Sequence, residues 1–312
     1  MNTTSLRYFS EYIAQGSAQK AAESLGISRS SITRNIKALE ESLGVSLLMS
    51  TVNGIAPTEA GIVVLRRARA IIKIEDDLRF DFSDSQDYKG QVIIGMGGMR
   101  AQCILPCVLP EFRSKYPNID VQVQDLRFYD DRISALLNYR IDFLVTGNSL
   151  PADGILFEPF MQEELVCIAP AGDEFIREHS YIQNNQLFVR LEDFSEKPFI
   201  LGYPNMKSRI SSNQVLQTLG YRPHVIMQIQ NSYTASILAC HGLGYALVPL
   251  SLSRMVGGAE FPVYHLNPDL HANWPVGVAS LKQVGLSRAA EQLKIAIMQN
   301  SYSLTDSSTI IR

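Results

Sequence analysis

A short stretch near the N-terminus carries hydroxyl and cationic side chains that could hydrogen-bond to nucleic acid. These side chains are Ser28, Arg29, Ser30, Ser31, Thr33, Arg34 and Lys37. Ile32, Ile36 and Leu39 recur between them at helical spacing, which puts the polar residues on the opposite face. No acid follows until Glu40. Cations and hydroxyls can read base edges in the major groove, so the pattern predicts DNA contact. The alternative is the solvated face of a plain three-helix unit.

Residues 5–44 must form three short helices if that face is to be presented. Ser17 and Ser28 are suited to cap the second and third helices, and Gly16, Gly26 and Gly44 to end all three. Only two residues separate the second helix from the third, so the pair turns sharply. This spacing is typical of a helix-turn-helix.

A hairpin and a long helix are expected next. Apolar residues flank the turn Asn53-Gly54, which predicts a β-wing in which Asn53 could contact DNA. Thr58 is suited to cap a helix from about 59 to the low 80s. Its apolar stripe consists of Val64, Ala68, Ile71, Leu78 and Phe82. The stripe predicts pairing with a second copy of the chain, or else packing against its own body. The polar residues 83–90 are expected to form a hinge.

From residue 91 onward, apolar runs alternate with helical patterns, which predicts an α/β body. Runs at 91–96, 119–126, 141–147, 164–170, 197–203, 224–229 and 245–250 are expected as strands, mostly in parallel sheets. The run at 164–170 is expected to start a second unit, and the last helix to return to the first. Ligands bind where loops follow the carboxyl ends of such strands. The loop residues are Gly97, Gly98, Met99, Arg100, Gly147, Asn148, Tyr203, Asn205, Asn231, Ser232 and Tyr233.

Composition narrows the class of protein. Of 312 residues, 46% are hydrophobic and 19% charged, which excludes wholesale disorder. Residues 1–73 hold nine basic and five acidic side chains, whereas the remainder has a net charge of −7, so an anionic partner fits the N-terminal end only. No apolar run could cross a membrane, no export signal is visible, and four cysteines are too few for a disulfide scaffold. A cytoplasmic location is expected.

The sequence gives little support for nucleotide binding, metal binding or catalysis. The run 95–100 follows a strand, but Arg100 stands where a dinucleotide-binding loop needs its third glycine. Cys103 and Cys107 could share a helix face, yet the five histidines show no metal-ligand spacing. No hydrolase, zinc-peptidase or phosphate-loop motif occurs. We therefore expect no catalytic residue, no metal and no cofactor, and buried thiols rather than a redox switch.

The types and spacing of residues in the first 65 positions resemble those of LysR-type transcriptional regulators. The matching residues are Phe9, Gly16, Ser17, Ala21, Ala22, Leu25, Ser28, Arg34, Leu39, Glu40, Leu43, Gly44, Leu47, Leu48 and Thr58–Gly61. The segments IGMGGMRAQCILPCVLPEFRSKYPNIDVQV, IDFLV and HGLGYALVPL resemble the effector domain of the same family in order and spacing. The resemblance implies a winged helix-turn-helix at 1–58, a dimerising linker at 59–89 and a two-lobed effector domain at 90–312. Lobe I is expected at about 90–162 and 267–300, and lobe II at about 163–266.

The same resemblance implies double-stranded DNA, a small-molecule effector, RNA polymerase and the chain itself, as dimer or tetramer, as partners. The family usually has Gln-Pro after the third-helix cap and arginines in the wing, where this chain has Arg29-Ser30, Met49-Ser50 and Asn53. Affinity for DNA is therefore expected to rest on the third helix and on Arg66, Arg67 and Arg69. The alternative function is a solute-receptor-type binding protein whose N-terminal helices merely dimerise.

The loops named above are, by resemblance, those that line the space between the two lobes. Family members often have Ser or Thr near Met99, where this chain offers Arg100 beside glycines with accessible amides. A guanidinium and free amides favour a carboxylate or phosphate, so a small anionic effector is predicted, with a ring stacked on Tyr203 or Tyr233. The alternative is an Arg100 that points to solvent or pairs with a surface acid.

Overall fold

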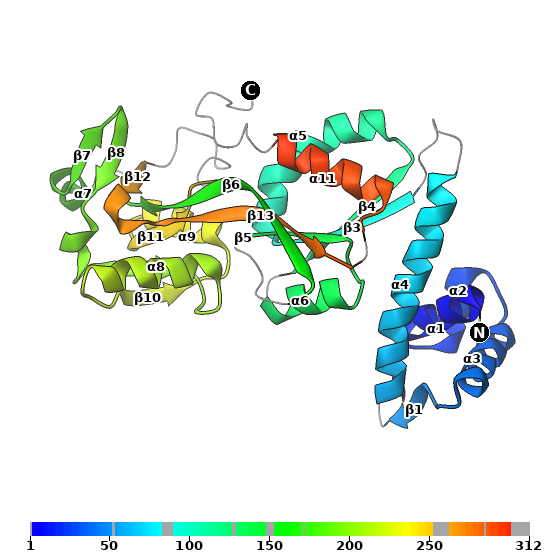
Figure 1. The fold of residues 1–312 in the computed structure, drawn as a ribbon. Coiled ribbons are helices and arrows are strands. Elements are labelled where there is room, and N and C mark those ends of the chain that lie inside the picture. Colours follow the sequence, from blue (N-terminus) through cyan, green and yellow to red (C-terminus); the bar gives the residue numbers. More distant parts are fainter. Residues whose placement is uncertain are drawn as a thin grey trace.

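The computed structural model describes residues 2–51, 54–82, 90–126, 129–147, 153–170, 172–251, 262–283 and 285–300. A small helical N-terminal domain, a long helix and a two-lobed α/β body follow one another along the chain (Figure 1). The α/β body with an all-α winged N-terminal domain, predicted from the sequence, is confirmed. None of the described helices is long and apolar enough to cross a lipid bilayer.

The N-terminal domain consists of three helices and a two-stranded wing. They are α1 (Thr3–Gln15), α2 (Ala18–Leu25), α3 (Arg29–Leu43), β1 (Leu48–Thr51) and β2 (Gly54–Pro57). The side chains of Ser17 and Ser28 cap α2 and α3 as expected. Gly26 has a φ of +65°, which lets α2 end one residue before the turn into α3. Phe9, Ile32 and Leu39 form the centre of the core, each with 1% of its surface exposed or less.

Helix α4 (Glu59–Asp81) begins where Thr58 accepts a hydrogen bond from the Gly61 amide at 2.9 Å. It packs against α1, where Arg7 forms ion pairs with Glu75 and Asp76. The predicted apolar stripe on α4 is divided between residues that face the N-terminal core and residues that are exposed. Ala68 is fully buried in the N-terminal core and is not available to a second copy, whereas Val64 packs against that core but stays partly exposed, so its pairing with a second copy stays a prediction. Ile71, Leu78 and Phe82 are exposed, as are Val63 and Ile74.

Lobe I contains parallel strands covered by helices. Its elements are β3 (Gly90–Met96), α5 (Gly98–Lys115), β4 (Ile119–Asp125), α6 (Tyr129–Leu137), β5 (Phe143–Gly147) and α11 (Arg288–Asn300). Strand β3 pairs in parallel with β4 and β5. Helix α11 packs on α5 and β3, with a hydrogen bond from the Tyr116 hydroxyl to Gln292 at 2.8 Å. The last helix thus returns to the first lobe, as the sequence predicted.

Lobe II has its own parallel strands and a small antiparallel extension. Its elements are α7 (Glu174–Glu178), β7 (Ser180–Gln183), β8 (Gln186–Val189), η1 (Leu191–Phe194), β9 (Pro198–Leu201), α8 (Lys207–Thr218), β10 (His224–Gln228), α9 (Ser232–Cys240), β11 (Tyr245–Pro249), β12 (Val263–Leu266) and η2 (Pro268–Leu270). Strand β9 pairs in parallel with β10 and β11, so the loops after β9, β10 and β11 emerge at one edge.

Two long antiparallel strands join the lobes. They are β6 (Ile155–Ile168) and β13 (Asn273–Leu281), which run side by side between the lobes in Figure 1. Strand β6 pairs with β13 as far as Glu164 and with β11 from Leu165 onward. The prediction that this strand starts near residue 164 is therefore wrong, because its first half belongs to lobe I. Strand β13, whose pairing with β6 begins at Asn273, carries the chain back to lobe I.

We expect Gly61→Ala to destabilise the N-terminal domain. A β-carbon on Gly61 would lie 2.1 Å from the Leu47 carbonyl oxygen, which belongs to the backbone at the base of the wing. Alanine favours a helix by about 1 kcal/mol over glycine, but forced overpacking costs about 1–3 kcal/mol. Urea unfolding of the full chain should show the loss. Gly285→Ala is the control, since nothing lies within 4 Å of its β-carbon position. A Gly61→Ala protein at least as stable as the parent would contradict this packing.

Candidate nucleic-acid interface and interlobe site

The outer face of α3 presents most of the side chains that the sequence assigned to DNA. Ser28, Arg29, Ser30, Thr33, Arg34 and Lys37 are exposed, whereas Ser31 is half-buried. The Ser28 hydroxyl accepts the Ser31 amide at 3.2 Å and lies 2.9 Å from the hydroxyls of both Ser30 and Ser31. Ser28 therefore caps the helix, while the arginines and Lys37 extend from it. Asn53 lies outside the described residues.

Packing behind α3 fixes the orientation of that face. Ala21 and Ala22 are buried, and their small size lets α2 approach α3. The Ile27 amide donates to the Ala22 carbonyl at 3.0 Å, which closes the turn. Asn35 accepts a hydrogen bond from Ser5 at 3.2 Å and so ties α3 to α1.

Glu40 holds the wing on α3, a role that the sequence reading missed. Its Oε1 accepts hydrogen bonds from the amides of Leu47 at 2.7 Å and Leu48 at 3.3 Å. On the other side of the wing, the Thr58 hydroxyl donates to the Ser46 carbonyl at 2.7 Å. The sequence signal for this role was an acidic residue near the end of a helix whose outer face is otherwise basic. The recognition face and the wing are thereby one rigid unit.

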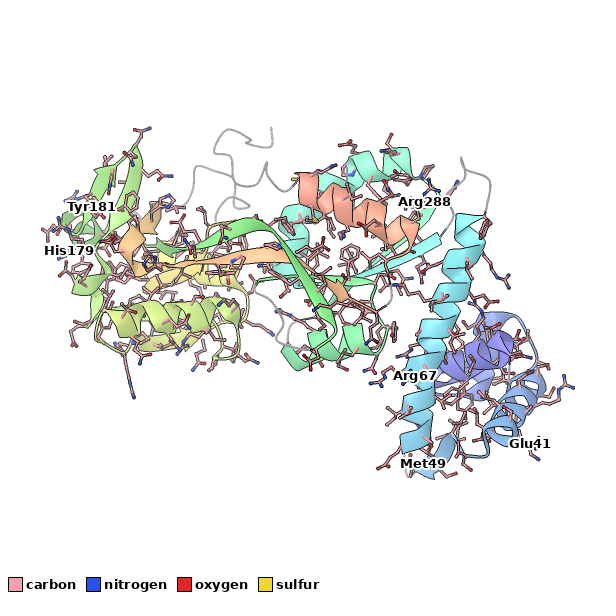
Figure 2. The ribbon with its side chains drawn as sticks, in the orientation of Figure 1. Glu41, Met49, Arg67, His179, Tyr181 and Arg288 are labelled. Carbon is pink, nitrogen blue, oxygen red and sulfur yellow. The ribbon has the colours of Figure 1, made fainter. Side chains whose placement is uncertain are left out.

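The basic residues on α4 do not all face the same way as α3. Arg66 and Arg67 are exposed, and Arg67 extends from the side of α4 away from α1–α3 (Figure 2). Arg69 donates to the Asn138 carbonyl of lobe I at 3.4 Å, and burial lowers the pKa of its guanidinium. The expectation that Arg69 supports DNA affinity is therefore wrong, because this side chain binds the effector domain.

In lobe I, the structure brings Arg100 and Gly147 together with two residues that the sequence reading did not assign. A β-carbon on Gly147 would lie 2.8 Å from Trp274 Nε1 and 3.7 Å from Arg100 Nη2. Trp274 is opposite Glu163 in the β6–β13 register, where the strands pass between the lobes. Burial lowers the pKa of Arg100, and the Glu163 carboxylate opposes this shift. We call Arg100, Gly147, Glu163, Trp274 and Lys207 the interlobe cluster.

Lys207, from lobe II, completes this cluster. It begins α8, and its Nζ lies 5.8 Å from the centroid of the Trp274 ring. Desolvation lowers the pKa of this amine. Met206, at the N-cap of α8, makes no side-chain capping bond, and the first turn holds no acid. A cation and a helix N-terminus of lobe II thus approach the indole of β13.

Some predicted effector contacts are already engaged in structural roles. The Gly98 amide donates to Asp125 Oδ1 at 3.0 Å, so the expectation of a free amide there is wrong. Asn231 caps α9 by accepting from the Tyr233 and Thr234 amides at 2.9 and 3.3 Å. Ser232 is buried, and Asn205 is exposed.

Two aromatic side chains and one asparagine were also predicted in these loops. Tyr203 and Tyr233 are 46% and 38% exposed, and no described ring contact or hydrogen bond joins either side chain to Arg100. Ring stacking on them stays a prediction. Asn148 falls outside the described ranges, and Met99 is half-buried at the start of α5.

The four cysteines are free thiols, of which Cys103 and Cys167 are buried. Burial raises the pKa of Cys103 to about 12 and that of Cys240 to about 11, and it also raises the pKa of Cys167. Cys107 donates to the Cys103 carbonyl at 3.7 Å, within the same helix. In the described part of the chain, no group of three His, Cys, Asp or Glu side chains could hold a metal ion.

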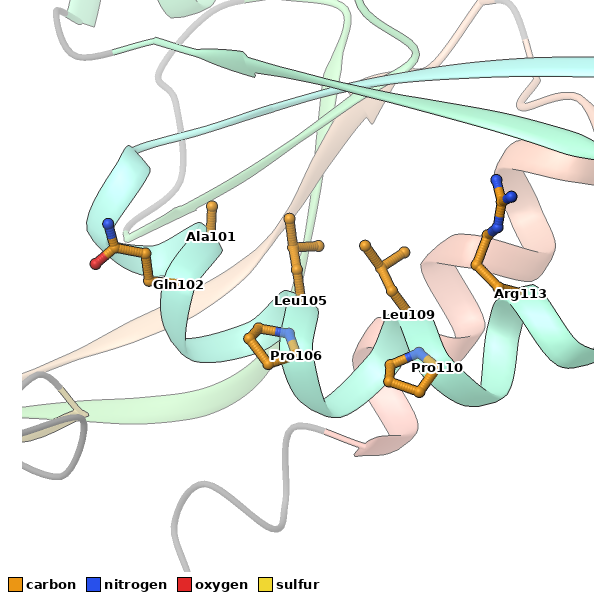
Figure 3. A pocket seen from close by; sticks show the side chains of 7 residues that line it. All are labelled: Ala101, Gln102, Leu105, Pro106, Leu109, Pro110 and Arg113. Carbon is orange, nitrogen blue, oxygen red and sulfur yellow. The ribbon is translucent and has the colours of Figure 1, made fainter. Parts of the chain in front are cut away.

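A concave surface lies on the outer face of α5 (Figure 3). It has a volume of about 530 Å³ and is lined mainly by apolar side chains. The lining residues are Ala101, Gln102, Leu105, Pro106, Leu109, Pro110 and Arg113. Pro106 and Pro110 have no amide hydrogen, so the carbonyls of Gln102 and Pro106 lack their helical donors. This surface is separate from the interlobe cluster.

Comparisons with known proteins match both parts of the chain. A family model described as "Bacterial regulatory helix-turn-helix protein, lysR family" matches residues 3–62, and "LysR substrate binding domain" matches residues 85–300. The nitrogen assimilation regulatory protein Nac of Klebsiella aerogenes is 27% identical over 265 residues, covering 83% of this chain and 82% of Nac.

Two solved structures show the same fold. A full-length OxyR variant from Pseudomonas aeruginosa has a TM-score of 0.76 at 19% identity and covers 96% of each chain. Full-length CbnR, in a complex with its target DNA, has a TM-score of 0.55 at 20% identity and covers 96% of this chain and 100% of its own. At these identities the likeness concerns the fold alone.

We expect Cys103, Cys167 and Cys240 to resist alkylation in the folded protein. Their raised pKa values keep the thiols protonated near neutral pH, and the thiolate is the nucleophile. Iodoacetamide labelling followed by peptide mass spectrometry measures this, with the urea-unfolded chain as the reactive control. Labelling of Cys103 in the folded protein as fast as in urea would contradict the burial argument.

Proposed function

The chain belongs to the LysR family of bacterial helix-turn-helix regulators, and we propose that α3 reads a specific DNA sequence under control of a small anion bound between the lobes. It is a DNA-binding transcriptional regulator with an effector-binding domain. The observation that carries the DNA proposal is the exposed face of α3, where Arg29, Thr33, Arg34 and Lys37 lie with no acid among them. The proposed site of action is the cytoplasm.

The two arginines and Thr33 have the chemistry for base readout. A guanidinium can bind guanine O6 and N7 through two bonds, whereas Lys37 is suited to a phosphate. Ser28 and the α3 N-terminus would face a backbone phosphate. Met49 and Ile55 of the wing are exposed apolar residues, so the described wing adds shape rather than charge. A purely dimerising N-terminal module has no use for this polar face, which argues against the solute-receptor alternative.

We propose bounds of 1–58 for the DNA-binding domain, 59–89 for the linker and 90–312 for the effector domain. Relatives that are transcriptional regulators support a function without catalysis, and we assign no reaction to any residue. RNA polymerase is a partner that promoter binding would imply, but no described residue is assigned to it.

Self-association is proposed along α4. Val63, Ile71, Ile74 and Leu78 are between 38% and 54% exposed and fall on one side of the helix together with Arg67. A second copy would cover this apolar seam, and Phe82, at 86% exposure, extends it. A tetramer needs a further surface on each subunit, and the concave face of α5 is the candidate.

The proposed effector is a small anion. Burial lowers the pKa of Arg132 and the nearby Arg100 lowers it further, while Lys207 approaches the Trp274 ring from lobe II. Cations that repel one another in a partly desolvated site are stabilised by an anion placed between them. The anion would therefore favour the arrangement in which the two lobes approach.

Selection of bound genomic fragments tests the DNA proposal. The wild-type chain should enrich a limited set of fragments, and Arg29→Ala should bind them more weakly by about 1–3 kcal/mol and with relaxed sequence preference. Arg177→Ala is the control, because this arginine is exposed on α7 in lobe II. Equal loss on specific and nonspecific DNA would make Arg29 a phosphate contact. No enrichment by the wild type would overturn the proposal.

The α4 seam predicts a change in oligomeric state. Ile74→Asp with Leu78→Asp would bury unpaired charge at the seam, so the dimer should dissociate at concentrations at which the parent is assembled. Light scattering measures the mass. Ile62→Asp is the matched control, since Ile62 is 54% exposed on the same helix but points away from the seam. An unchanged mass in the double variant would place the interface elsewhere.

A further inference from the structure

The linker helix α4 is joined to its two neighbours in different ways. Its contact with the N-terminal domain is a packed apolar core, whereas its contact with lobe I is made by charged side chains. We propose that the second contact is a releasable latch, in which Asp142 and the C-terminal end of α6 hold α4 against the effector domain and thereby set the position of the DNA-binding domain. The proposal rests on the proposed function, because that position matters only if α3 reads DNA.

The N-terminal domain and α4 form one unit. Ala68 is fully buried in the N-terminal core. Three further apolar side chains of α4 pack against that core, namely Val64, Leu65 and Ile72. Arg7 of α1 also forms ion pairs with Glu75 and Asp76 of α4. Separating these parts would expose apolar surface to water, so the recognition helix is expected to move together with α4.

Lobe I shares no such core with α4. None of the described apolar residues of α4 belongs to, or packs against, the apolar clusters of lobe I. The helix lies beside the lobe (Figure 1), and two of its cations, Arg69 and Lys73, donate hydrogen bonds across the junction. Because these residues are four apart, they project from one face of the helix. Small polar contacts between domains permit relative motion, so the junction with lobe I is the place where the molecule can open.

Asp142 is the fixed half of an ion pair with Lys73. Its Oδ2 accepts the Ile93 amide at 2.7 Å, and its own amide donates to the Ile93 carbonyl at 2.7 Å. Strand β3 therefore holds the carboxylate in place, and Oδ1 accepts the Lys73 ammonium. The side chains of Lys73 and Asp142 are 18% and 13% exposed, so the pair is largely shielded from water.

Arg69 binds the C-terminal end of α6. Tyr139 has a φ of +53°, and the Arg140 amide donates to the Ala135 carbonyl at 2.9 Å, so the helix ends in a left-handed turn. The Asn138 carbonyl, at this turn, accepts from the Arg69 guanidinium at 3.4 Å. The C-terminus of a helix carries partial negative charge, which favours a cation in this position.

Opposing effects keep the latch releasable. Burial lowers the pKa of the Arg69 guanidinium, and the nearby Arg140 lowers it further, so the closed arrangement disfavours this charge. In a shielded ion pair, the attraction between the two charges is offset by their desolvation. Lys73 and Asp142 return to water together when α4 leaves lobe I, whereas removal of one partner leaves the other buried and unpaired. The pair therefore specifies one arrangement of the domains without making it permanent.

Carbodiimide coupling tests the contact in the full-length wild-type chain, because it joins an amine to a carboxylate that lies against it. Peptide mass spectrometry should find Lys73 joined to Asp142. A mixture of isotope-labelled and unlabelled protein shows whether the two residues belong to one chain. Absence of this product, or a product that joins a labelled to an unlabelled chain, would overturn the proposal.

A double-mutant cycle tests release. Lys73→Met keeps an unbranched side chain without the charge, and Asp142→Asn keeps an acceptor for the Ile93 amide. Each single change leaves one buried charge unpaired, so the ratio of closed to open molecules should fall by about 100-fold. Small-angle scattering should then show a larger radius of gyration at an unchanged mass. The double variant removes both charges and should return toward the dimensions of the parent.

Lys282→Met is the control for the cycle, since this lysine of lobe I is exposed. Circular dichroism verifies that each variant is folded. Single variants with the dimensions of the parent, or a double variant as extended as the single ones, would overturn the latch.

DNA duplexes with two half-sites at different spacings separate this proposal from the proposed function. The wild type should prefer one spacing, and Lys73→Met should lose that preference but keep its affinity for a single half-site, because α3 is unaltered. A cross-linked, releasable chain that enriches no DNA would defeat the regulator and leave the latch intact. A chain that enriches DNA but keeps its spacing preference in Lys73→Met would overturn the latch and leave the regulator.

Discussion

The antiparallel pair β6–β13 is the constraint on which the effector domain depends. Both strands run between the lobes: β5 of lobe I pairs with β13, and β11 and β12 of lobe II pair with the second half of β6. At the crossing the register sets Trp274 opposite Glu163, and it thereby puts an indole and a carboxylate between the lobes. The strands cannot slip by one residue without turning every side chain to the other face. Trp274 and Glu163 are accordingly held by backbone pairing rather than by a flexible loop.

At the DNA-binding end, a few side chains each make more than one stabilising contact. Glu40 uses one carboxylate oxygen to accept two amides at the base of the wing, and Thr58 both caps α4 and bonds the wing backbone. Gly61 lets the first turn of α4 approach the Leu47 carbonyl closely. The recognition helix, wing and linker helix therefore share one set of contacts, and the exposed face of α3 needs no support from DNA to be in place.

Local signals in the sequence were enough to predict most helices, the wing and the strands that are apolar along their whole length. The capping serines and the left-handed glycines act over a few residues, so α1 to α3 could be located from the sequence. The first half of β6 and all of β13 could not, because Pro159, Pro275 and Gly277 look like strand breakers out of context. Tertiary packing also determines which residues of the α4 stripe are buried, since Ala68 faces the N-terminal core. Trp274 became a site residue only through pairing with a strand distant in sequence.

Strand β5 connects the two ends of the molecule physically. Just before it, Asp142 forms an ion pair with Lys73 of the linker helix and accepts the Ile93 amide at 2.7 Å. At its other end, Gly147 lies directly against the Trp274 ring, so that a β-carbon there would come within 2.8 Å of Nε1. Between these points the strand is hydrogen-bonded to β3 on one side and β13 on the other. A strand paired on both edges moves with its sheet, because sliding it alone would break the ladders on both sides. Any change in how β13 sits against β5, where Val276 pairs with Gly147, must therefore be accommodated by the same short strand that fixes the linker helix at Asp142.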